Sequence, residues 1–289
     1  MNVEHVQTKQ EIEQLLGVAG IRPRKRFGQH FLIDGNLMRK LVNCAEIGPH
    51  DLVLEVGGGT GGLTDLLVSR AGHIVCVEVD RDLHGILLDR FAEAGNITIV
   101  LRDALESKHR VCRELAEAIR DFDGGQGGEV KLVANLPYQV ATPLVMDLLV
   151  DHPAVCRLVF TVQAEVGERL VAHVGDKSYG PLSIVSQLRC GVEIVARIPP
   201  QAFWPRPAVD SVMMRMEVRE TSPIAPGDVP TFARFVRAVF DHRRKTLRSA
   251  LRYVVDVPTQ ERICRSRDAS RRPESVALNE WVAMYELTR

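Results

Sequence analysis

Two patterns of apolar residues alternate along the first two thirds of the chain. Short, almost continuously apolar segments such as residues 52–56 are separated by longer segments whose apolar residues recur every three or four positions. The first pattern is typical of strands buried in a parallel sheet, and the second of amphipathic helices. Strands are predicted at 52–56, 74–79, 97–101, 130–134, 157–162 and 211–218, and helices at 35–47, 63–69, 81–93, 142–150 and 164–171, with another helix ending at 116–122. This order predicts an α/β fold with a doubly wound, Rossmann-like sheet.

The two ends of the chain depart from this alternation. Near the N-terminus, Ile12, Leu15 and Leu16 mark the apolar face of a short helix that we expect outside the main fold. Near the C-terminus, a stretch at 222–227 with two prolines and a glycine is typical of a linker, and a helical pattern follows it. The expected division is an N-terminal extension at 1–21, an α/β domain at 22–221 and a small C-terminal helical domain at 222–289.

Composition places the chain among ordinary globular proteins. Of its 289 residues, 45% are hydrophobic and 26% are charged, which is enough apolar material for a sizeable core. The sequence has neither an apolar run long enough for a membrane span nor the apolar centre of a signal peptide. Its six cysteines occur singly, without the spacing of a metal site, so we expect reduced thiols, no metal and a cytoplasmic location.

Charge changes this picture because it is unevenly distributed. The net charge is zero, yet residues 231–272 contain twelve Lys or Arg against four Asp or Glu. A second basic cluster lies at residues 22–26. Two basic clusters on an otherwise acidic chain favour a surface that faces nucleic-acid phosphates. The candidate phosphate-binding residues are Arg24, Lys25, Arg26, Arg243, Arg244, Lys245 and Arg248.

A glycine-rich loop follows the first predicted strand. Gly57, Gly59 and Gly62 satisfy the pattern G-x-G-x-x-G, and Glu78 ends the next strand 21 residues after Gly57. Such a loop lets backbone amides approach an anion, while the acid can hold a ribose hydroxyl pair. This loop fits a dinucleotide as well as any other cofactor that contains adenosine. A plain structural turn is the alternative interpretation.

Polar residues also follow the third and fourth strands of the predicted sheet. Asp103 could accept a hydrogen bond from an adenine amine, or it could simply cap a helix. The Asn135 side chain and the Leu136 carbonyl offer acceptors for a second amino group, Tyr138 offers a ring for stacking, and Pro137 fixes the turn between them. A β-turn with a structural proline is the alternative here. Taken together, these residues favour an S-adenosylmethionine site followed by a clamp for a target amine.

Nine ordered motifs resemble one family, the small-subunit ribosomal RNA adenine dimethyltransferases. The resemblance covers about residues 22–289, and one such motif alone would be weak. The motifs lie at residues 24–32, 55–61, 78–80, 103–104, 135–138, 163–166, 179–183, 203–211 and 243–248.

The resemblance implies a reaction, a cofactor and a set of site residues. The reaction is methyl transfer from S-adenosyl-L-methionine to N6 of two adjacent adenosines near the 3′ end of small-subunit (16S) rRNA. The implied partner is that rRNA or a pre-30S particle, bound by a monomer through the basic C-terminal domain. The implied cofactor-binding residues are His30, Leu32, Gly57, Gly59, Glu78, Asp103 and Asn135. The implied catalytic residues are Asn135, Leu136, Pro137, Tyr138 and Phe203, with the two rings stacking on the extruded base.

The chain departs from the family pattern at two positions, and three rival functions stay open. His30 stands where most members have Asn, and Gly58 where they have Pro, a change expected to loosen the loop and weaken cofactor binding modestly. The rivals are an NAD-dependent oxidoreductase, a non-catalytic RNA-binding or transcription factor on the same fold, and a large-subunit rRNA methyltransferase that confers antibiotic resistance. Leu136 disfavours the last of these, because the resistance enzymes usually carry Ile there.

Overall fold

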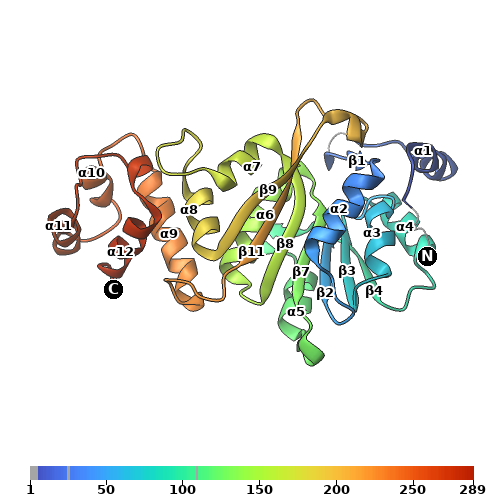
Figure 1. Cartoon of the computed structure of the whole chain (residues 1–289), viewed down its shortest axis with the longest axis horizontal. Coiled ribbons are helices and arrows are strands. Elements are labelled where there is room, and N and C mark those ends of the chain that lie inside the picture. Colours follow the sequence, from blue (N-terminus) through green and yellow to red (C-terminus); the bar gives the residue numbers. More distant parts are fainter. Residues whose placement is uncertain (1–5, 25–26, 109) are drawn as a thin grey trace. The chain divides into compact units, whose positions relative to one another are not determined.

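A central sheet organises the part of the chain that the computed structural model describes, which is residues 6–24, 27–108 and 110–289 (Figure 1). Its seven described strands are β2 (Leu52–Val56), β3 (His73–Glu78), β4 (Ile97–Leu101), β7 (Val130–Asn135), β8 (Val155–Gln163), β9 (Cys190–Ile198) and β11 (Ser211–Val218), in the spatial order β4-β3-β2-β7-β8-β11-β9. The strands from β4 to β8 pair in parallel, whereas β11 runs antiparallel to β8. The predicted Rossmann-like α/β fold is confirmed, although the sheet is not parallel throughout.

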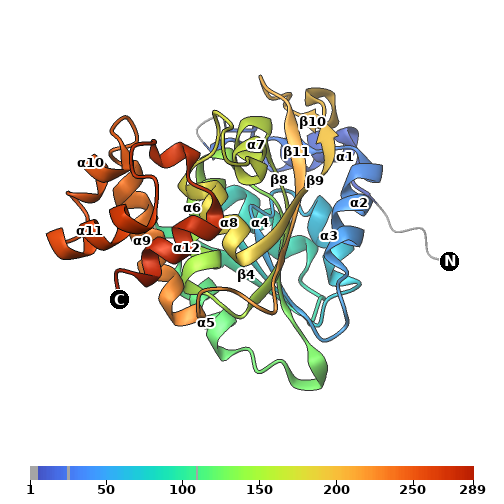
Figure 2. The same cartoon turned by 60° about the vertical axis from the view of Figure 1, so that its left-hand side comes forward.

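Helices cover both faces of this sheet. On one face, α2 (Gly35–Ala45), α3 (Gly62–Val68) and α4 (Arg81–Arg90) share a hydrophobic cluster with alternate strand residues, among them Val53, Ile74 and Val133. Helices α2 and α3 lie side by side (Figure 2). The chain then crosses to the other side of β2, so right-handed crossovers place α5 (Arg113–Asp121) and α6 (Tyr138–Asp151) on the opposite face.

Two short strand pairs complete the fold near the carboxyl ends of the parallel strands. β1 (Phe31–Leu32) pairs antiparallel with β10 (Phe203–Trp204), which brings two segments that are far apart in sequence together. β5 (Leu105–Ser107) and β6 (Arg110–Val111) form a small hairpin directly after β4. Both pairs border the site described below.

The N-terminal helix α1 (Lys9–Val18) differs from its expected place outside the main fold. A capping box between Thr8 and Glu11 begins it. Ile12 and Leu16 are buried against Phe31 and other apolar residues of the α/β part. The predicted apolar positions 12 and 16 are therefore buried, but the helix packs onto the main fold because its apolar face needs a partner.

The described chain divides into two compact units. Unit 1 comprises Met1–Leu148, His152–Gly167 and Glu193–Val218, and unit 2 comprises Leu149–Asp151, Glu168–Val192 and Arg219–Arg289. The predicted division into three consecutive segments stays a prediction. Each of the two compact units consists of three segments that alternate along the chain with those of the other unit. No helix among the described residues is both long enough and apolar enough to span a membrane.

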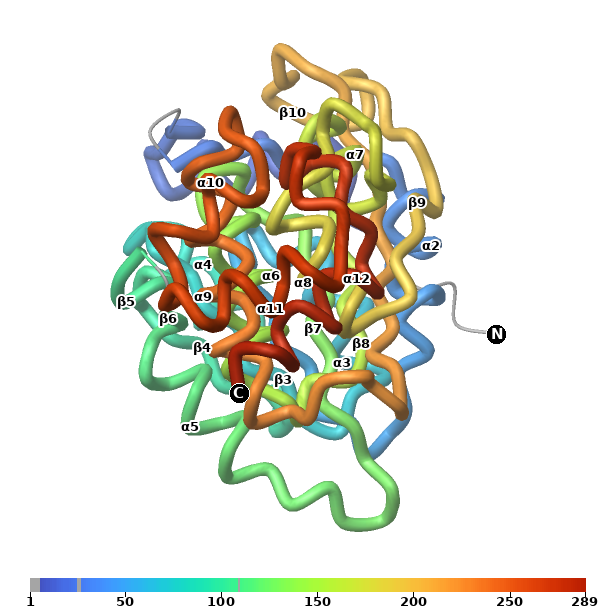
Figure 3. The backbone as a smooth tube through the Cα atoms, turned by 90° about the vertical axis from the view of Figure 1, so that its left-hand side faces the viewer, coloured from blue at the N-terminus to red at the C-terminus, as the bar shows by residue number. Residues whose placement is uncertain are grey.

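Unit 2 is helical (Figure 3), and its apolar side chains form a core of their own. Its helices include α8 (Pro181–Arg189), α9 (Val229–Phe240), α10 (Leu247–Leu251), α11 (Val257–Ser266) and α12 (Leu278–Glu286). The fully buried Trp281 packs on Phe235 and Phe240, and Phe232 lies in the same cluster. The helical pattern at 231–255 is interrupted, because a turn at 241–246 separates α9 from α10. Of the four basic residues expected on a helix there, only Arg248 is helical.

Candidate cofactor and active site

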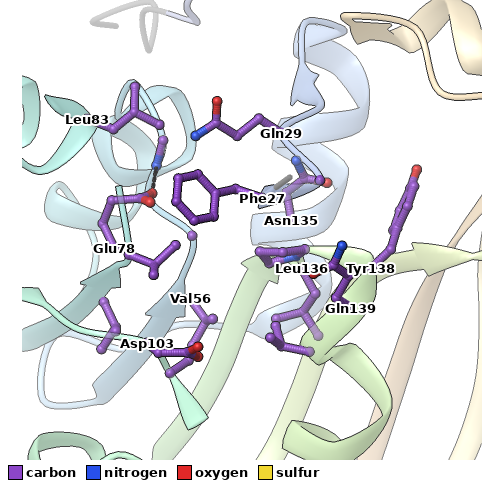
Figure 4. Close-up of a pocket in the computed structure, with 18 of the residues that line it drawn as sticks. Phe27, Gln29, Val56, Glu78, Leu83, Asp103, Asn135, Leu136, Tyr138 and Gln139 are labelled. Carbon is purple, nitrogen blue, oxygen red and sulfur yellow. Dashed lines mark hydrogen bonds between the residues drawn. The ribbon is translucent and has the colours of Figure 1, made fainter. Parts of the chain in front are cut away.

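The candidate site lies at the carboxyl ends of four adjacent strands. Asp103 follows β4, Glu78 ends β3, Gly57 follows β2 and Asn135 ends β7. The strand order reverses between β2 and β7, which is where open α/β sheets bind their ligands. A cavity of about 270 Å³ opens at this point within unit 1 (Figure 4). It is lined by every predicted cofactor-binding and catalytic residue except Leu32 and Phe203.

The glycine loop forms one wall of the cavity. Its backbone packs so closely against neighbouring residues that there is no room for side chains. Gly57 and Gly59 have φ values of 80° and 60°, a region that residues with a Cβ rarely adopt. A Cβ on Gly57 would lie 3.1 Å from Pro137 Cγ, and one on Gly59 would lie 3.0 Å from Phe31 Cε1. The glycine pattern thus serves close packing beside the cavity and is more than a surface turn.

Gly58 also has a structural reason in this chain. A Cβ at this position would lie 2.4 Å from Cys76 Sγ and 2.9 Å from Leu87 Cδ1. The space beneath the loop is therefore already filled by Cys76, which is fully buried. The Cys76 side chain occupies the volume that a larger residue at position 58 would need. The packing beneath the loop is therefore complete with glycine at this position.

Glu78 is held rigidly at the edge of the cavity. It is only 4% exposed, its Oε2 accepts a hydrogen bond from the Gly59 amide at 2.9 Å, and its Oε1 accepts one from the Asp80 amide at 2.9 Å. Burial raises the pKa of Glu78, although the two amides act in the opposite direction. Each oxygen keeps a further lone pair, so the group can accept hydrogen bonds from a hydroxyl pair.

Asp103 lies beside Glu78 on the next strand end (Figure 4). Its Oδ1 accepts a hydrogen bond from the Leu105 amide at 3.0 Å, and the chain continues into β5. The alternative role as a helix N-cap is therefore wrong, because no helix begins here. The exposed carboxylate is fixed by this turn and borders a cavity whose apolar wall includes Val77, Val79 and Leu83.

Asn135 is held by two neighbours that fix the orientation of its amide. Its Nδ2 donates to the His30 carbonyl at 2.8 Å, and its Oδ1 accepts from the Thr161 hydroxyl. A carbonyl oxygen only accepts hydrogen bonds, so the nitrogen must face His30 and the oxygen must face Thr161. One lone pair of Oδ1 remains for a ligand. The structure thus presents an oriented acceptor at this strand end.

His30 and Tyr138 form a stacked pair next to Asn135. Their ring centroids are 5.6 Å apart with an interplanar angle of 29°. His30 Nδ1 lies 2.6 Å from the Pro205 carbonyl and must donate to it, which leaves Nε2 as the second polar atom of the ring. The Tyr138 hydroxyl lies 2.7 Å from Ser211 Oγ, and burial raises its pKa. His30 therefore keeps a polar atom where most family members have an amide.

Leu32 and Phe203 face the core and not the cavity. Phe203 is 3% exposed and Leu32 is 6% exposed, and both belong to the hydrophobic cluster under α2 and α3. They are cross-strand partners in the β1–β10 pair. Phe203 was predicted to stack on a base. In the structure, apolar side chains enclose its ring, so the ring does not face the cavity.

The basic arm before β1 folds back over the start of α4. Arg24 contacts Asp80 at 2.7 Å and Asp82 at 2.5 Å, and these acids raise its pKa. Gln29 donates to Asp80 at 2.9 Å and accepts from the Arg24 amide at 2.6 Å. The charge of Arg24 is therefore compensated within the protein. Lys25 and Arg26, the other two arm candidates, lie outside the described residues.

The C-terminal basic candidates lie in unit 2 and are differently placed. Arg243, Arg244 and Lys245 are exposed in the turn between α9 and α10, and Arg248 is exposed on α10. None of these four forms an ion pair with a described carboxylate. Their charges are thus available to a ligand.

Three contributing residues were missed by the sequence analysis. Thr161 orients Asn135, Gln29 fixes the arm, and Phe27 lines the cavity and is seen between Glu78 and Asn135 in Figure 4. Phe27 and Gln29 lie within the motif at residues 24–32, so the sequence does carry a signal for these two residues. Thr161 had no such signal, because its role depends on pairing with Asn135 across β7 and β8.

Together the fold and the site define a class of enzyme. The Rossmann-like sheet, the glycine loop, the acids after β3 and β4 and the oriented amide after β7 are the arrangement of a methyltransferase that uses a nucleoside cofactor. Residues 20–272 match the family described as ribosomal RNA adenine dimethylase, and the chain belongs to this family. The predicted enzyme class is confirmed.

Individual relatives agree with this assignment. The chain is 41% identical over 232 residues to the ribosomal RNA small subunit methyltransferase A of Moorella thermoacetica, covering 80% of each protein. It is 36% identical over 281 residues to that of Pelotomaculum thermopropionicum, covering 95% of this chain and 94% of the relative.

Solved structures show the same fold. A dimethyladenosine transferase from Plasmodium falciparum matches with a TM-score of 0.70 and 25% identity, over 88% of this chain and 96% of the other. The 23S rRNA methyltransferase ErmE matches with a TM-score of 0.64 over 89% of this chain and 99% of the other. At 21% identity, the likeness to ErmE concerns the fold alone.

Proposed function

We propose that this protein transfers methyl groups from S-adenosyl-L-methionine to N6 of two adjacent adenosines near the 3′ end of small-subunit rRNA. The family match and the relatives named small subunit methyltransferase A support the small-subunit substrate. The observation that carries the chemistry is the oriented Asn135 acceptor beside the nucleoside-sized cavity. We further propose that the enzyme acts in the cytoplasm, as a monomer, on the rRNA or on a pre-30S particle.

The residues of the cavity fit an adenosine-containing sulfonium cofactor. Glu78 would accept hydrogen bonds from the ribose hydroxyls, and Asp103 would accept one from the adenine amine. The backbone of the glycine loop lines the cavity and would lie against the cofactor, and the polar atoms of His30 and Asn135 would receive its methionine end. When bound, the cofactor supplies a methyl group on a positively charged sulfur.

The amide and the turn after β7 would prepare the target amine. The lone pair of an adenine N6 is delocalised into the ring, so the nitrogen is a weak nucleophile. Hydrogen bonds from N6 to Asn135 Oδ1 and to the Leu136 carbonyl would favour a pyramidal nitrogen with its lone pair directed at the methyl group. Pro137 fixes this turn, and alignment of the reacting atoms supplies much of the rate acceleration.

No strong base is needed for the final proton transfer. The methylated nitrogen is an acidic ammonium, which can release its proton to water. We propose that the Tyr138 ring stacks on the extruded adenine through the face turned away from His30. The hydrogen bond from Tyr138 to Ser211 would hold that ring in place.

We assign RNA phosphate binding to the C-terminal segment 222–289. Exposed, unpaired cations at Arg243, Arg244, Lys245 and Arg248 support this role. Arg24 is a weaker candidate because Asp80 and Asp82 already neutralise it.

Transfer of labelled methyl groups tests the proposal. The purified protein is incubated with S-adenosylmethionine and with small or large ribosomal subunits that lack adenine dimethylation, and the nucleosides are then analysed. We expect dimethyladenosine only in the small subunit. Labelling confined to the large subunit would contradict the proposed substrate, and RNA binding without any labelling would leave a non-catalytic RNA-binding factor as the better interpretation.

A further inference from the structure

An exposed aromatic pair lies in the basic part of unit 2. His242 is in the turn after α9, and Tyr253 follows α10. Their rings stack with centroids 4.1 Å apart and an interplanar angle of 28°. Tyr253 is nevertheless 61% exposed, which is unusual for a large aromatic side chain. With one face covered by His242, this exposure requires the other face of the Tyr253 ring to be open to solvent.

Lys245 holds the Tyr253 ring without covering it. Its Nζ lies 2.5 Å from the phenol oxygen but 4.3 Å from the ring centroid. These two distances place the ammonium beside the phenol oxygen and away from the centre of the ring. The hydrogen bond from Lys245 lowers the pKa of Tyr253, which is the effect expected of a cation at the hydroxyl. His242 and Lys245 together fix the ring before any ligand arrives.

Cations without a described carboxylate partner lie close in sequence to these two rings. Arg243, Arg244, Arg248 and Arg252 are exposed and make no ion pair with a described carboxylate. Other arginines of unit 2 do have acidic partners, such as Arg265 with Glu261 and Arg271 with Glu280. An open aromatic face among free cations is the combination that binds unpaired nucleotides, because the ring stacks on a base while the cations contact phosphates.

We propose that Tyr253, backed by His242, is a stacking platform for one unpaired base of the bound RNA, separate from the methyl-transfer site. This inference rests on the proposed function only in taking RNA as the substrate. It deepens that function, since a purely phosphate-binding surface would accept duplex and loop equally, whereas a platform selects RNA with an unstacked base.

Two RNAs of equal phosphate number test the platform in the absence of a methyl donor. One is a stem-loop with 2-aminopurine in a single-stranded loop, and the other is a blunt duplex. For wild-type protein we expect quenching of the loop fluorophore. We expect Tyr253→Leu to weaken stem-loop binding about tenfold and to lose the quenching, while duplex binding is unchanged. Tyr253→Phe keeps the ring and should behave like wild type.

Arg265→Ala is the matched control, because it removes an exposed cation of unit 2 that is already paired with Glu261. We expect it to leave selectivity for the loop unchanged. Equal losses on both RNAs for Tyr253→Leu, or no loss on either, would overturn the platform. A loss seen only with protein-containing small-subunit particles would also overturn it, in favour of contact with a ribosomal protein.

The outcome is separable from that of the proposed function. Loop-selective loss of binding without small-subunit methylation by the wild-type protein would refute the proposed reaction and retain the platform. Methylation by both wild type and Tyr253→Leu, with identical binding of the two RNAs, would retain the reaction and refute the platform. Thermal unfolding of each variant verifies that the exposed substitution has left the fold intact.

Discussion

The candidate cofactor cavity of unit 1 and the basic turn of unit 2 differ in whether their polar side chains have partners within the protein. In the cavity, Glu78 is held by two backbone amides, and Asn135 by Thr161 and the His30 carbonyl; on the arm that leads into the cavity, Arg24 is held by two carboxylates. In the turn at 241–246, the arginines have no described carboxylate partner. Groups fixed in advance suit the alignment of a small molecule, whereas free cations suit a large anionic partner that supplies its own phosphates.

The largest expected effect comes from removing a group that the cavity holds in place. Asn135→Ala should lower kcat by about a thousandfold, or about 4 kcal/mol, because the oriented acceptor for the target amine is lost. Cofactor affinity should change only a few-fold. Single-turnover methylation and cofactor titration measure the two quantities separately.

Asn96→Ala is the matched control for that variant. Asn96 donates to the Val68 and Ala71 carbonyls at 3.0 and 2.9 Å, away from the cavity, so its loss should lower stability and leave kcat unchanged. The kcat of Thr161→Val should lie between those of the two variants, because this change removes one hydrogen bond that orients the Asn135 amide but keeps the amide itself. An unchanged kcat for Asn135→Ala would exclude it from the clamp.

A second expected effect concerns Glu55, which lies behind the glycine loop. It is 1% exposed and hydrogen-bonded by Thr64 at 2.8 Å, and burial raises its pKa from 4.5 to about 7. A raised pKa means that the folded state binds the proton more tightly than the unfolded state. Its contribution to stability is therefore full below about pH 4.5 and is lost as the pH rises through 7, by up to about 3 kcal/mol.

Glu55→Gln should remove that part of the pH dependence. Urea unfolding of both proteins at several pH values between 4.5 and 8 measures the difference. Glu46→Gln is a useful contrast when the measurements are extended below pH 4.5. Arg157 lowers the pKa of the exposed Glu46, so the contribution of Glu46 to stability is lost as the pH falls, not as it rises. A difference between wild type and Glu55→Gln that is constant with pH would show that Glu55 is not protonated in the folded state.

A third prediction concerns the cations of the turn that have no carboxylate partner among the described residues. Replacing Arg243, Arg244 and Lys245 together with Ala should reduce the slope of log affinity against log salt by up to about 2.7 on duplex RNA, if each cation displaces one counterion. Binding titrations between low and moderate salt measure this slope. An unchanged slope would mean that these side chains face solvent in the complex.

The sequence was informative where local chemistry decides the structure. The strands at 52–56, 97–101 and 211–218 were predicted with their observed bounds, because short and mainly apolar segments of this length have few alternatives. The residues at the strand ends were found for the same reason, since Glu78, Asp103 and Asn135 each follow such a run. Parallel pairing then brings them to one edge of the sheet.

What the sequence could not provide depends on pairings between distant segments. Thr161 meets Asn135 only through the register of β7 with β8. Phe203 faces the core because β10 pairs with β1, and the sequence around Phe203 does not indicate that pairing. The pairing of Arg24 with Asp80 and Asp82 requires the arm to fold back on α4, and a run of basic residues carries no sign of that.

The smallest expected effect concerns Arg24, which shares a feature with each of the two regions. Its positive charge suits RNA binding, but its two carboxylate partners hold it within the protein. Arg24→Ala should weaken cofactor affinity a few-fold, since the arm that it anchors includes the cavity-lining residues Phe27 and Gln29. The salt slope of RNA binding should not change, because a cation already paired with carboxylates displaces no counterion from RNA. Arg81→Ala, at an exposed position at the start of α4, is the matched control and should alter neither quantity. A salt slope reduced by about one in Arg24→Ala would mean that Arg24 leaves its carboxylates for a phosphate. In that case the arm belongs with the basic turn as part of the RNA surface.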